Sequence, residues 1–110
     1  MLHIVERTGD HVTGALPVDV DLYSTPSLRA EVDRMIDEGC RHLTLDASRM
    51  LFIDSTGITA LVSWYQRLAA LRGSVAVRGL SDHHHSLLTR LGLDTVMTIS
   101  GRPLHEVPPP

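Results

Sequence analysis

The sequence contains one cysteine, Cys40, and has no run of apolar residues long enough to cross a membrane. A single cysteine cannot form a disulfide within the chain, so the fold does not depend on an oxidising compartment. A membrane-spanning helix needs about 20 mostly apolar residues, and residues 1–7 lack the basic segment and apolar stretch of a signal peptide. We therefore expect a cytoplasmic protein with no membrane insertion.

Positive charge is also scarce. Ten arginines and no lysine stand against 13 acidic residues, which gives a net charge of −3 and a pI of about 6.1. The arginines are scattered along the chain, whereas a nucleic-acid-binding surface needs clustered positive charge to displace counterions from phosphates. The composition therefore argues against direct contact with nucleic acid.

The length fits one compact domain. A chain of 110 residues, 43% of them hydrophobic, can build a single core. No internal repeat or interior linker divides it, and the biased stretch is the end, where residues 108–110 are all proline. We predict one domain over residues 1–103 and a flexible, proline-rich tail over residues 104–110.

The hydrophobic pattern alternates between strand-like and helical segments. Short runs of β-like composition predict strands over residues 2–6, 11–16, 42–46, 74–78 and 95–99, and an apolar run covers residues 50–53. Apolar residues at helical spacing predict helices over residues 26–38, 56–71 and 82–91. The expected caps and stops of these helices are Thr25, Ser81 or Asp82 at their starts and Gly39, Gly73 and Gly92 at their ends.

This order of elements predicts the fold class. Strands that alternate with helices of about 10 to 16 residues indicate right-handed parallel crossovers. The first two strand-like runs flank Gly9 and Asp10, a pair that suits a tight turn, so they predict an antiparallel hairpin. The expected fold is an α/β sandwich with a mixed, mostly parallel β-sheet.

The segment Asp54-Ser55-Thr56-Gly57 joins the apolar run to the second helix. Its polar side chains can cap first-turn amides that have no partner within the helix, which is an ordinary structural role. Alternatively, the Ser55 hydroxyl is exposed at this junction, where a kinase can reach it. A phosphate there would add about 1.5 to 2 negative charges beside Asp54 and turn a neutral docking surface into an anionic one.

The sequence favours neither catalysis nor metal binding. The Gly-x-Ser-x-Gly element of a hydrolase is absent, and no histidine is tied by spacing to Ser55. His83, His84 and His85 are consecutive, so in a helix they point about 100° apart and do not converge on one ion. We interpret them as solvated first-turn residues and predict no enzyme activity, no catalytic residue, no metal and no cofactor.

Trp64 and Arg67 on the second helix are a further candidate for partner contact, because an aromatic ring beside an arginine can anchor a protein interface. However, Trp64 falls at the edge of the apolar sector of its helix. A large ring at that position usually completes the boundary of the core. We interpret Trp64 as packing on the flank of the core, with partner contact as the alternative.

Four segments together resemble the STAS domain, in particular the bacterial anti-sigma factor antagonists. They are residues 21–29 (Asp-Leu-Tyr-Ser-Thr-Pro-Ser-Leu-Arg), 43–46 (Leu-Thr-Leu-Asp), 52–58 (Phe-Ile-Asp-Ser-Thr-Gly-Ile) and 91–94 (Leu-Gly-Leu-Asp). The resemblance covers most of residues 16–100. It implies a STAS-type sandwich in which the helices pack mainly on one face of the sheet.

The resemblance also implies a partner-switching mechanism. In that family, an anti-sigma factor with serine kinase activity phosphorylates the first hydroxyl residue of the motif, here Ser55, with Thr56 as the second choice. The unphosphorylated antagonist binds the kinase, the phosphorylated form is released, and a serine phosphatase resets it. The implied partner-binding residues are Asp21, Ser24, Asp54, Ser55, Thr56, Gly57, Thr59 and Ser63. The alternative is a STAS subunit of a lipid-transport or stress-signalling assembly that binds its partner without a switch.

Overall fold

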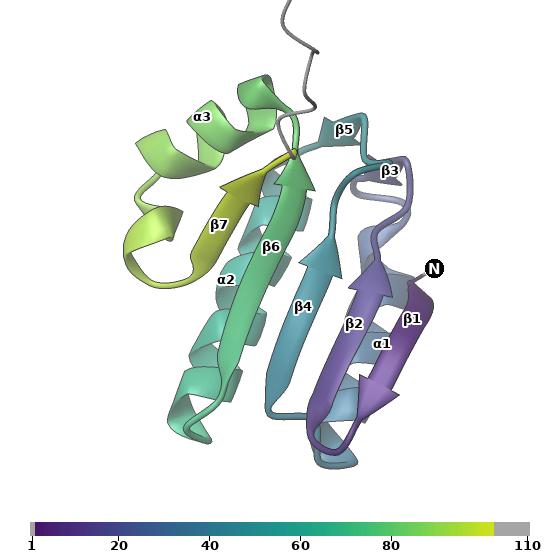
Figure 1. The fold of residues 1–110 in the computed structure, drawn as a ribbon. Coiled ribbons are helices and arrows are strands. Elements are labelled where there is room, and N and C mark those ends of the chain that lie inside the picture. The colour runs from purple at the N-terminus through teal and green to yellow at the C-terminus, as the bar shows by residue number, and fades with distance from the viewer. Residues whose placement is uncertain (1, 103–110) are drawn as a thin grey trace, which may run out of the picture.

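The structure is a computed structural model, and it describes residues 2–102. The main sheet has five strands in the order β1 (His3–Thr8), β2 (His11–Ala15), β4 (His42–Asp46), β6 (Ser74–Leu80) and β7 (Thr98–Gly101) (Figure 1). A second, two-stranded sheet pairs β3 (Asp19–Val20) with β5 (Phe52–Ile53). The helices are α1 (Thr25–Asp37), α2 (Ser55–Ala70), α3 (Asp82–Arg90) and the short 3-10 helix η1 (Leu93–Thr95).

The main sheet is mixed and mostly parallel, as predicted. β1 pairs antiparallel with β2 across a turn at Gly9, whose φ of +60° is one that glycine adopts without strain. The other neighbouring strands pair in parallel. Their C-terminal ends therefore meet at one edge of the sheet, the upper edge in Figure 1, where β3 and β5 also lie.

Helices α1 and α2 lie on one face of the main sheet and enclose the core (Figure 1). Leu28, Val32 and Ile36 recur along the buried side of α1 at helical spacing. Alternate residues of β4, Leu43 and Leu45, point into the same core and are at most 1% exposed. The apolar residues at helical spacing in α1 and the alternating apolar residues of β4 therefore pack together in one layer.

The opposite face of the main sheet has no helix over it within residues 2–102 (Figure 1). Parallel strands are usually buried on both faces and read as continuous apolar runs. Here buried and less buried residues alternate instead, and the residues that face away from the core are mostly polar and half-buried or exposed, such as His11, His42, Thr44 and Asp46. The prediction that the helices pack mainly on one face is confirmed.

The start of α1 differs from the prediction. Ser24, not Thr25, stands at the cap position, and Thr25 is the first helical residue, with 1% of its surface exposed. The burial of Thr25 is a tertiary effect, which the local preference of threonine for cap positions does not contain. The stop of this helix is as predicted, since Gly39 has a φ of +112°.

The end of α2 also differs from the prediction. Arg72, not Gly73, adopts the left-handed conformation, with a φ of +62°. Gly73 is needed for a different reason: a Cβ added there would lie 1.9 Å from the backbone oxygen of Arg41. The glycine therefore permits close approach of two chain segments at the entry to β6.

The C-terminal third was predicted in part. Ser81 caps α3 by accepting a hydrogen bond from the His84 amide at 3.2 Å. Gly92 follows the helix with a φ of +82°, and Leu93 turns back into the core. The predicted strand over residues 95–99 was wrong at its start, because η1 occupies Leu93–Thr95 and β7 covers Thr98–Gly101.

The interpretation of Trp64 as a residue at the core boundary was wrong. Only 1% of its surface is exposed, so the ring lies inside the core and is not paired with Arg67 at the surface. Arg67 instead crosses to α1, where its guanidinium pairs with Asp37 and, at 3.4 Å, with Asp33. These ion pairs connect the outer sides of the two helices.

The interpretation of the three histidines as solvated was wrong for His84. His84 is 7% exposed because it lies on the side of α3 that packs against the fold, in line with Leu88. Burial lowers the pKa of His84, since the charged imidazole loses its hydration. His83 is exposed and His85 is half-buried.

Two further sequence expectations concern the proline-rich tail and the crossing of a membrane. The proline-rich tail predicted over residues 104–110 lies outside the described residues. Within residues 2–102, none of the helices combines the length and the apolar character that crossing a bilayer requires.

Candidate functional site

Asp54 organises the start of α2 and links it to the loop before α1. Its Oδ1 accepts hydrogen bonds from the amides of Thr56, at 2.9 Å, and Gly57, at 3.1 Å. Its Oδ2 accepts a hydrogen bond from the Leu22 amide at 3.1 Å. The carboxylate therefore caps the helix and also holds a segment 32 residues away in the sequence.

Ser55 is the first residue of α2, and its side chain is exposed at the positive end of the helix. Its carbonyl oxygen accepts a hydrogen bond from the Thr59 hydroxyl at 2.8 Å, one turn further on. Thr56, the other hydroxyl residue of the motif, is half-buried. Ser55 is therefore the more accessible of the two hydroxyls.

Gly57 allows α2 to begin directly against the small sheet. A Cβ at this position would lie 2.7 Å from Cγ1 of Val20 and 2.8 Å from its backbone oxygen. It would also lie 2.9 Å from Cγ1 of Ile53. Val20 and Ile53 are the paired residues of β3 and β5, so the glycine permits the first turn of α2 to lie close to this pair.

Asp21 and Ser24 form a compact turn beside the Asp54 carboxylate. Asp21 Oδ1 accepts hydrogen bonds from the amides of Ser24, at 2.9 Å, and Tyr23, at 3.0 Å. The Ser24 hydroxyl accepts a bond from the Asp21 amide at 3.0 Å and donates one to the Asp19 carbonyl at 2.8 Å. The Ser24 amide is the main reason that the pKa of Asp21 is lowered, so this carboxyl group remains ionised.

Thr59 and Ser63 extend the site along α2. They follow Ser55 at intervals of four residues, so the three hydroxyl residues share one side of the helix. Thr59 is exposed and contacts Ser55, whereas Ser63 is half-buried and lies two turns from the start of the helix. The structure thus places Thr59 with the Asp54 cluster and Ser63 at its periphery.

Large apolar side chains surround this cluster, and the sequence interpretation did not include them. The exposed fractions are 88% for Tyr23, 72% for Leu51, 61% for Leu22 and 50% for Phe52. Residues 50–53 form one apolar run in the sequence, but only its ends, Met50 and Ile53, are buried. One signal in the sequence could have indicated this exposure: the loop over residues 21–24 places two large apolar residues, Leu22 and Tyr23, between polar ones.

We call Leu22, Tyr23, Leu51 and Phe52 the apolar rim. Leu22 is joined to Asp54 by a hydrogen bond, and Phe52 precedes Asp54 by two residues on β5. The Val18 carbonyl accepts hydrogen bonds from the amides of Leu51, at 2.8 Å, and Phe52, at 3.1 Å. The rim and the Ser55 hydroxyl therefore lie at the same edge of the molecule, at the end where the parallel strands terminate (Figure 1).

The arrangement has the chemical character of a docking and modification site. It combines an accessible hydroxyl, two carboxylates that are engaged with backbone amides, and exposed apolar groups. Contiguous exposed apolar side chains on a small domain usually mark a surface that binds another molecule. A charge added to the hydroxyl would fall at the same end of the molecule as the apolar rim.

Comparison with known proteins places this geometry in a family. The family model described as "Mlab, STAS domain" matches residues 3–100. The chain is 26% identical to the anti-sigma-B factor antagonist of Listeria monocytogenes over 99 residues, which covers 89% of this chain and 86% of that protein.

Solved structures share the fold at lower sequence identity. The Bacillus protein SpoIIAA in its phosphorylated form superposes with a TM-score of 0.74 at 20% identity, covering 90% of each chain. An anti-sigma factor antagonist from Mycobacterium paratuberculosis superposes with a TM-score of 0.79 at 18% identity, covering 96% of this chain and 87% of that one. The family match spans nearly all of the described residues, and the topology agrees with it. The chain therefore belongs to the STAS domain family.

Proposed function

We propose that this chain is an anti-sigma factor antagonist regulated by phosphorylation of Ser55. In its unphosphorylated form it binds an anti-sigma factor that has serine kinase activity, and that binding frees a sigma factor. Phosphorylation of Ser55 releases the antagonist, and a serine phosphatase restores the binding form. The chain itself needs no catalytic residue and no cofactor for this cycle, and it acts in the cytoplasm.

The observation that carries the proposal is the exposure of Ser55, the first residue of α2, directly after the Asp54 that caps this helix. A kinase needs a hydroxyl that can enter its active site, and Ser55 meets that requirement better than the half-buried Thr56. The names of the relatives support the same role, since the Listeria monocytogenes protein is called an anti-sigma-B factor antagonist. One of the solved structures with a similar fold is SpoIIAA in its phosphorylated form, so a protein of this fold can carry a phosphate.

Release follows from the charges around Ser55. A phosphate carries about 1.5 to 2 negative charges at neutral pH. Asp54 and Asp21 lie in the same cluster, and the pKa of Asp21 is lowered, so its carboxylate is already charged. A partner that accepts the unmodified surface would have to desolvate this added charge or face it with its own groups.

The partner contact that we propose has two parts. The polar part consists of Asp21, Ser24, Asp54, Ser55, Thr56, Gly57, Thr59 and Ser63. The apolar rim adjoins it, and aromatic residues such as Tyr23 and Phe52 often supply much of the binding energy at protein interfaces. The hydroxyl group therefore sits where one modification changes the whole contact surface.

The test is to incubate the chain with ATP and candidate anti-sigma factor kinases, map the phosphate by mass spectrometry, and measure binding to the kinase that modifies it. We expect phosphate on Ser55 and none in the Ser55→Ala variant. Ser55→Ala should bind with native affinity, and Ser55→Glu should bind at least about 10-fold more weakly, a loss of roughly 1.4 kcal/mol.

Thr56→Val is the matched control, because it removes the neighbouring hydroxyl and keeps the side-chain shape. It is a control for the site of modification and should still be phosphorylated on Ser55. Equal affinities of Ser55→Ala and Ser55→Glu would contradict the switch and favour the alternative, a STAS subunit that binds permanently within a larger assembly. Phosphate on Thr56 alone would reassign the modified residue.

A further inference from the structure

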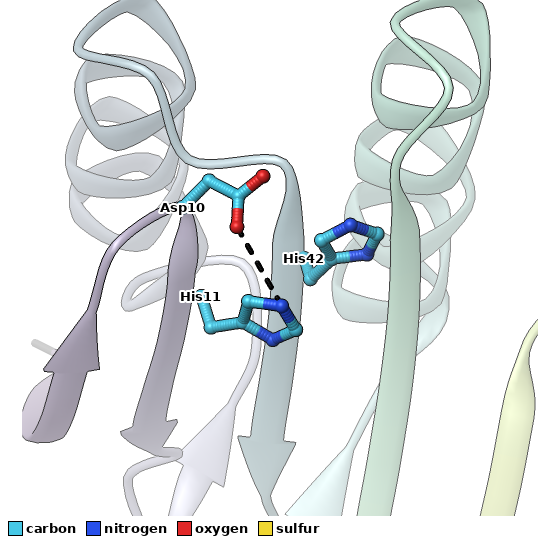
Figure 2. A group of neighbouring side chains, drawn as sticks. All are labelled: Asp10, His11 and His42. Carbon is cyan, nitrogen blue, oxygen red and sulfur yellow. Dashed lines mark ion pairs between the residues drawn. The ribbon is translucent and has the colours of Figure 1, made fainter.

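A second cluster of functional side chains lies on the uncovered face of the main sheet, away from Ser55. It consists of Asp10, His11 and His42 (Figure 2). His11 and His42 stand at the starts of β2 and β4, whereas Ser55 follows β5 at the edge where the parallel strands end. The two sites therefore occupy opposite ends of the sheet.

Strand register brings the two histidines together. β2 and β4 are parallel, and His11 is the residue directly opposite His42. Side chains opposite each other on neighbouring strands point to the same face of the sheet. The two imidazole rings are stacked with their centroids 4.5 Å apart and their planes inclined by 27°.

The backbone holds Asp10 next to this pair. The Asp10 carbonyl oxygen accepts hydrogen bonds from the amides of Arg41, at 2.8 Å, and His42, at 3.0 Å. The Asp10 carboxylate lies 3.5 Å from Nε2 of His11 (Figure 2). The main chain therefore fixes the positions of all three residues, although half or more of the Asp10 and His11 side chains is exposed.

The orientation of His42 suits a metal ligand. Its Nδ1 lies 2.8 Å from the Ser74 hydroxyl, at the start of β6, which leaves Nε2 as the nitrogen available for an ion. Histidine ligands usually have such a partner on the other ring nitrogen, because that hydrogen bond fixes the tautomer and the plane of the ring. Ser74 would thus act as a positioning residue.

We propose that Asp10, His11 and His42 form a binding site for a divalent transition-metal ion of the zinc type. One ligand atom from each side chain lies within 4.8 Å of the other two. Ligand atoms around a tetrahedral ion are about 3.3 Å apart, given metal–ligand bonds of roughly 2.0 to 2.2 Å. Rotation of the two exposed side chains, Asp10 and His11, closes this difference without movement of the strands.

The donor set defines the class of ion. Two imidazole nitrogens and one carboxylate oxygen suit zinc, cobalt and iron, whereas magnesium and calcium prefer sites made of oxygen alone. Three protein ligands leave at least one coordination position open to water. The site does not depend on the proposed phosphorylation of Ser55, so each proposal can fail without the other.

The test is equilibrium dialysis of the tag-free chain against zinc chloride, with cobalt chloride as a spectroscopic probe. We expect one ion per chain. His11→Gln, His42→Gln and Asp10→Asn should each weaken zinc binding by more than about 10-fold, and Ser74→Ala should weaken it by about 10-fold, the low end for loss of a ligand's hydrogen-bond partner. In Ser74→Ala the cobalt absorption spectrum should also shift, because the His42 ring is no longer fixed.

The matched control is the double variant His83→Gln/His85→Gln, which removes two histidines from α3 and should bind zinc within about twofold of the native chain. Ser55→Glu should also bind normally. Thermal unfolding without metal checks that each variant folds, and the exposed His11 position decides the result if His42→Gln does not fold. No zinc binding by the native chain, one ion per two chains, or loss of binding in the α3 variant would overturn the proposal.

Discussion

The two ends of the main sheet present polar residues in different ways. At the end where the parallel strands terminate, Asp54 and Asp21 act through hydrogen bonds to backbone amides, and most of their partners are within three residues in the sequence. At the other end, His11 and His42 are 31 positions apart and meet because their strands pair in register. The residues of the first end can be recognised as a motif in the sequence. The residues of the second end come together only through the pairing of β2 with β4.

This difference predicts how each end responds to mutation. At the Ser55 end, the side chains of a local motif add to the main-chain bonds between the β3 and β5 segments. Asp54 makes two long-range contacts there: its Oδ2 accepts from the Leu22 amide, and its own amide donates to the Val20 carbonyl. The histidine end is held by main-chain contacts between strands, including the bond from the Ser74 amide to the Arg41 carbonyl at 2.8 Å. Backbone changes should therefore affect the histidine end most, and side-chain changes the Ser55 end.

The largest expected effect is that of Gly73→Ala. The new Cβ would lie 1.9 Å from the Arg41 oxygen, a backbone atom that cannot turn away, so β4 and β6 must separate at their starts. We expect a loss of about 3 kcal/mol in the free energy of unfolding, measured by urea denaturation. Gly101→Ala is the control, because its Cβ would meet its nearest atom at an ordinary 3.6 Å. Equal losses in the two variants would contradict the close-packing explanation.

Asp54→Ala should have the next largest effect. It removes the cap of α2 and the bond to the Leu22 amide, which together should lower the free energy of unfolding by about 2 kcal/mol. Hydrogen exchange should become faster at the amides of Leu22 and Thr56. Asp54→Asn keeps one acceptor oxygen, which can still cap α2, but its NH2 group cannot accept from the Leu22 amide, so it should lose about half as much. A loss of similar size in both variants would contradict a separate contribution of the cap.

Arg67→Ala tests a region between the two ends and should have a smaller effect. Arg67 connects α2 to Asp33 and Asp37 of α1, but its side chain is 38% exposed. Exposed ion pairs contribute little because water and salt screen them, so we expect a loss below about 1 kcal/mol that shrinks further in high salt. Gln66→Ala, an exposed change on the same helix, is the control. A loss above 2 kcal/mol would mean that these pairs stabilise the helix packing strongly.

The smallest effect is a change in pH dependence at His84. Burial lowers the pKa of His84 below its ordinary value of 6.5, so the unfolded chain binds more protons between the two values. The contribution of His84 to stability is therefore complete above pH 6.5 and is lost as the pH falls through the lowered pKa. His84→Gln should unfold with less dependence on pH below 6.5 than the native chain.

Urea midpoints measured at several pH values check this prediction, and His85→Gln is the control from the neighbouring, less buried position. A native-like pH dependence in His84→Gln would show that other groups cause the acid sensitivity. The result also sharpens the comparison with the histidine end of the sheet. His84 is buried, so its protonation should affect stability, whereas the side chain of His11 at that end is exposed.

Several sequence predictions failed for a shared reason. Trp64 is predicted at the edge of the apolar sector of its helix and His84 in a solvated first turn, yet 1% and 7% of their surfaces are exposed. The pattern within one helix indicates which residues share a side, but how deeply that side is buried depends on the elements that pack against it. The apolar run over residues 50–53 does not indicate which of its residues are buried, and in the two-residue strand β5 Ile53 is buried whereas Phe52 is exposed.

The sequence by itself determined the α/β class, the alternation of elements, and the motif that positions Ser55, because periodicity and capping are properties of neighbouring residues. It also determined that Gly57 precedes an apolar helix face. It did not show that Val20 and Ile53 occupy the space that a side chain at Gly57 would need. Only the tertiary structure decided the depth of Trp64 and His84 and the meeting of His11 with His42. Those features depend on which strands pair and on how deeply each helix is buried. Strand pairing and helix burial are both determined by packing between segments that are distant in the chain.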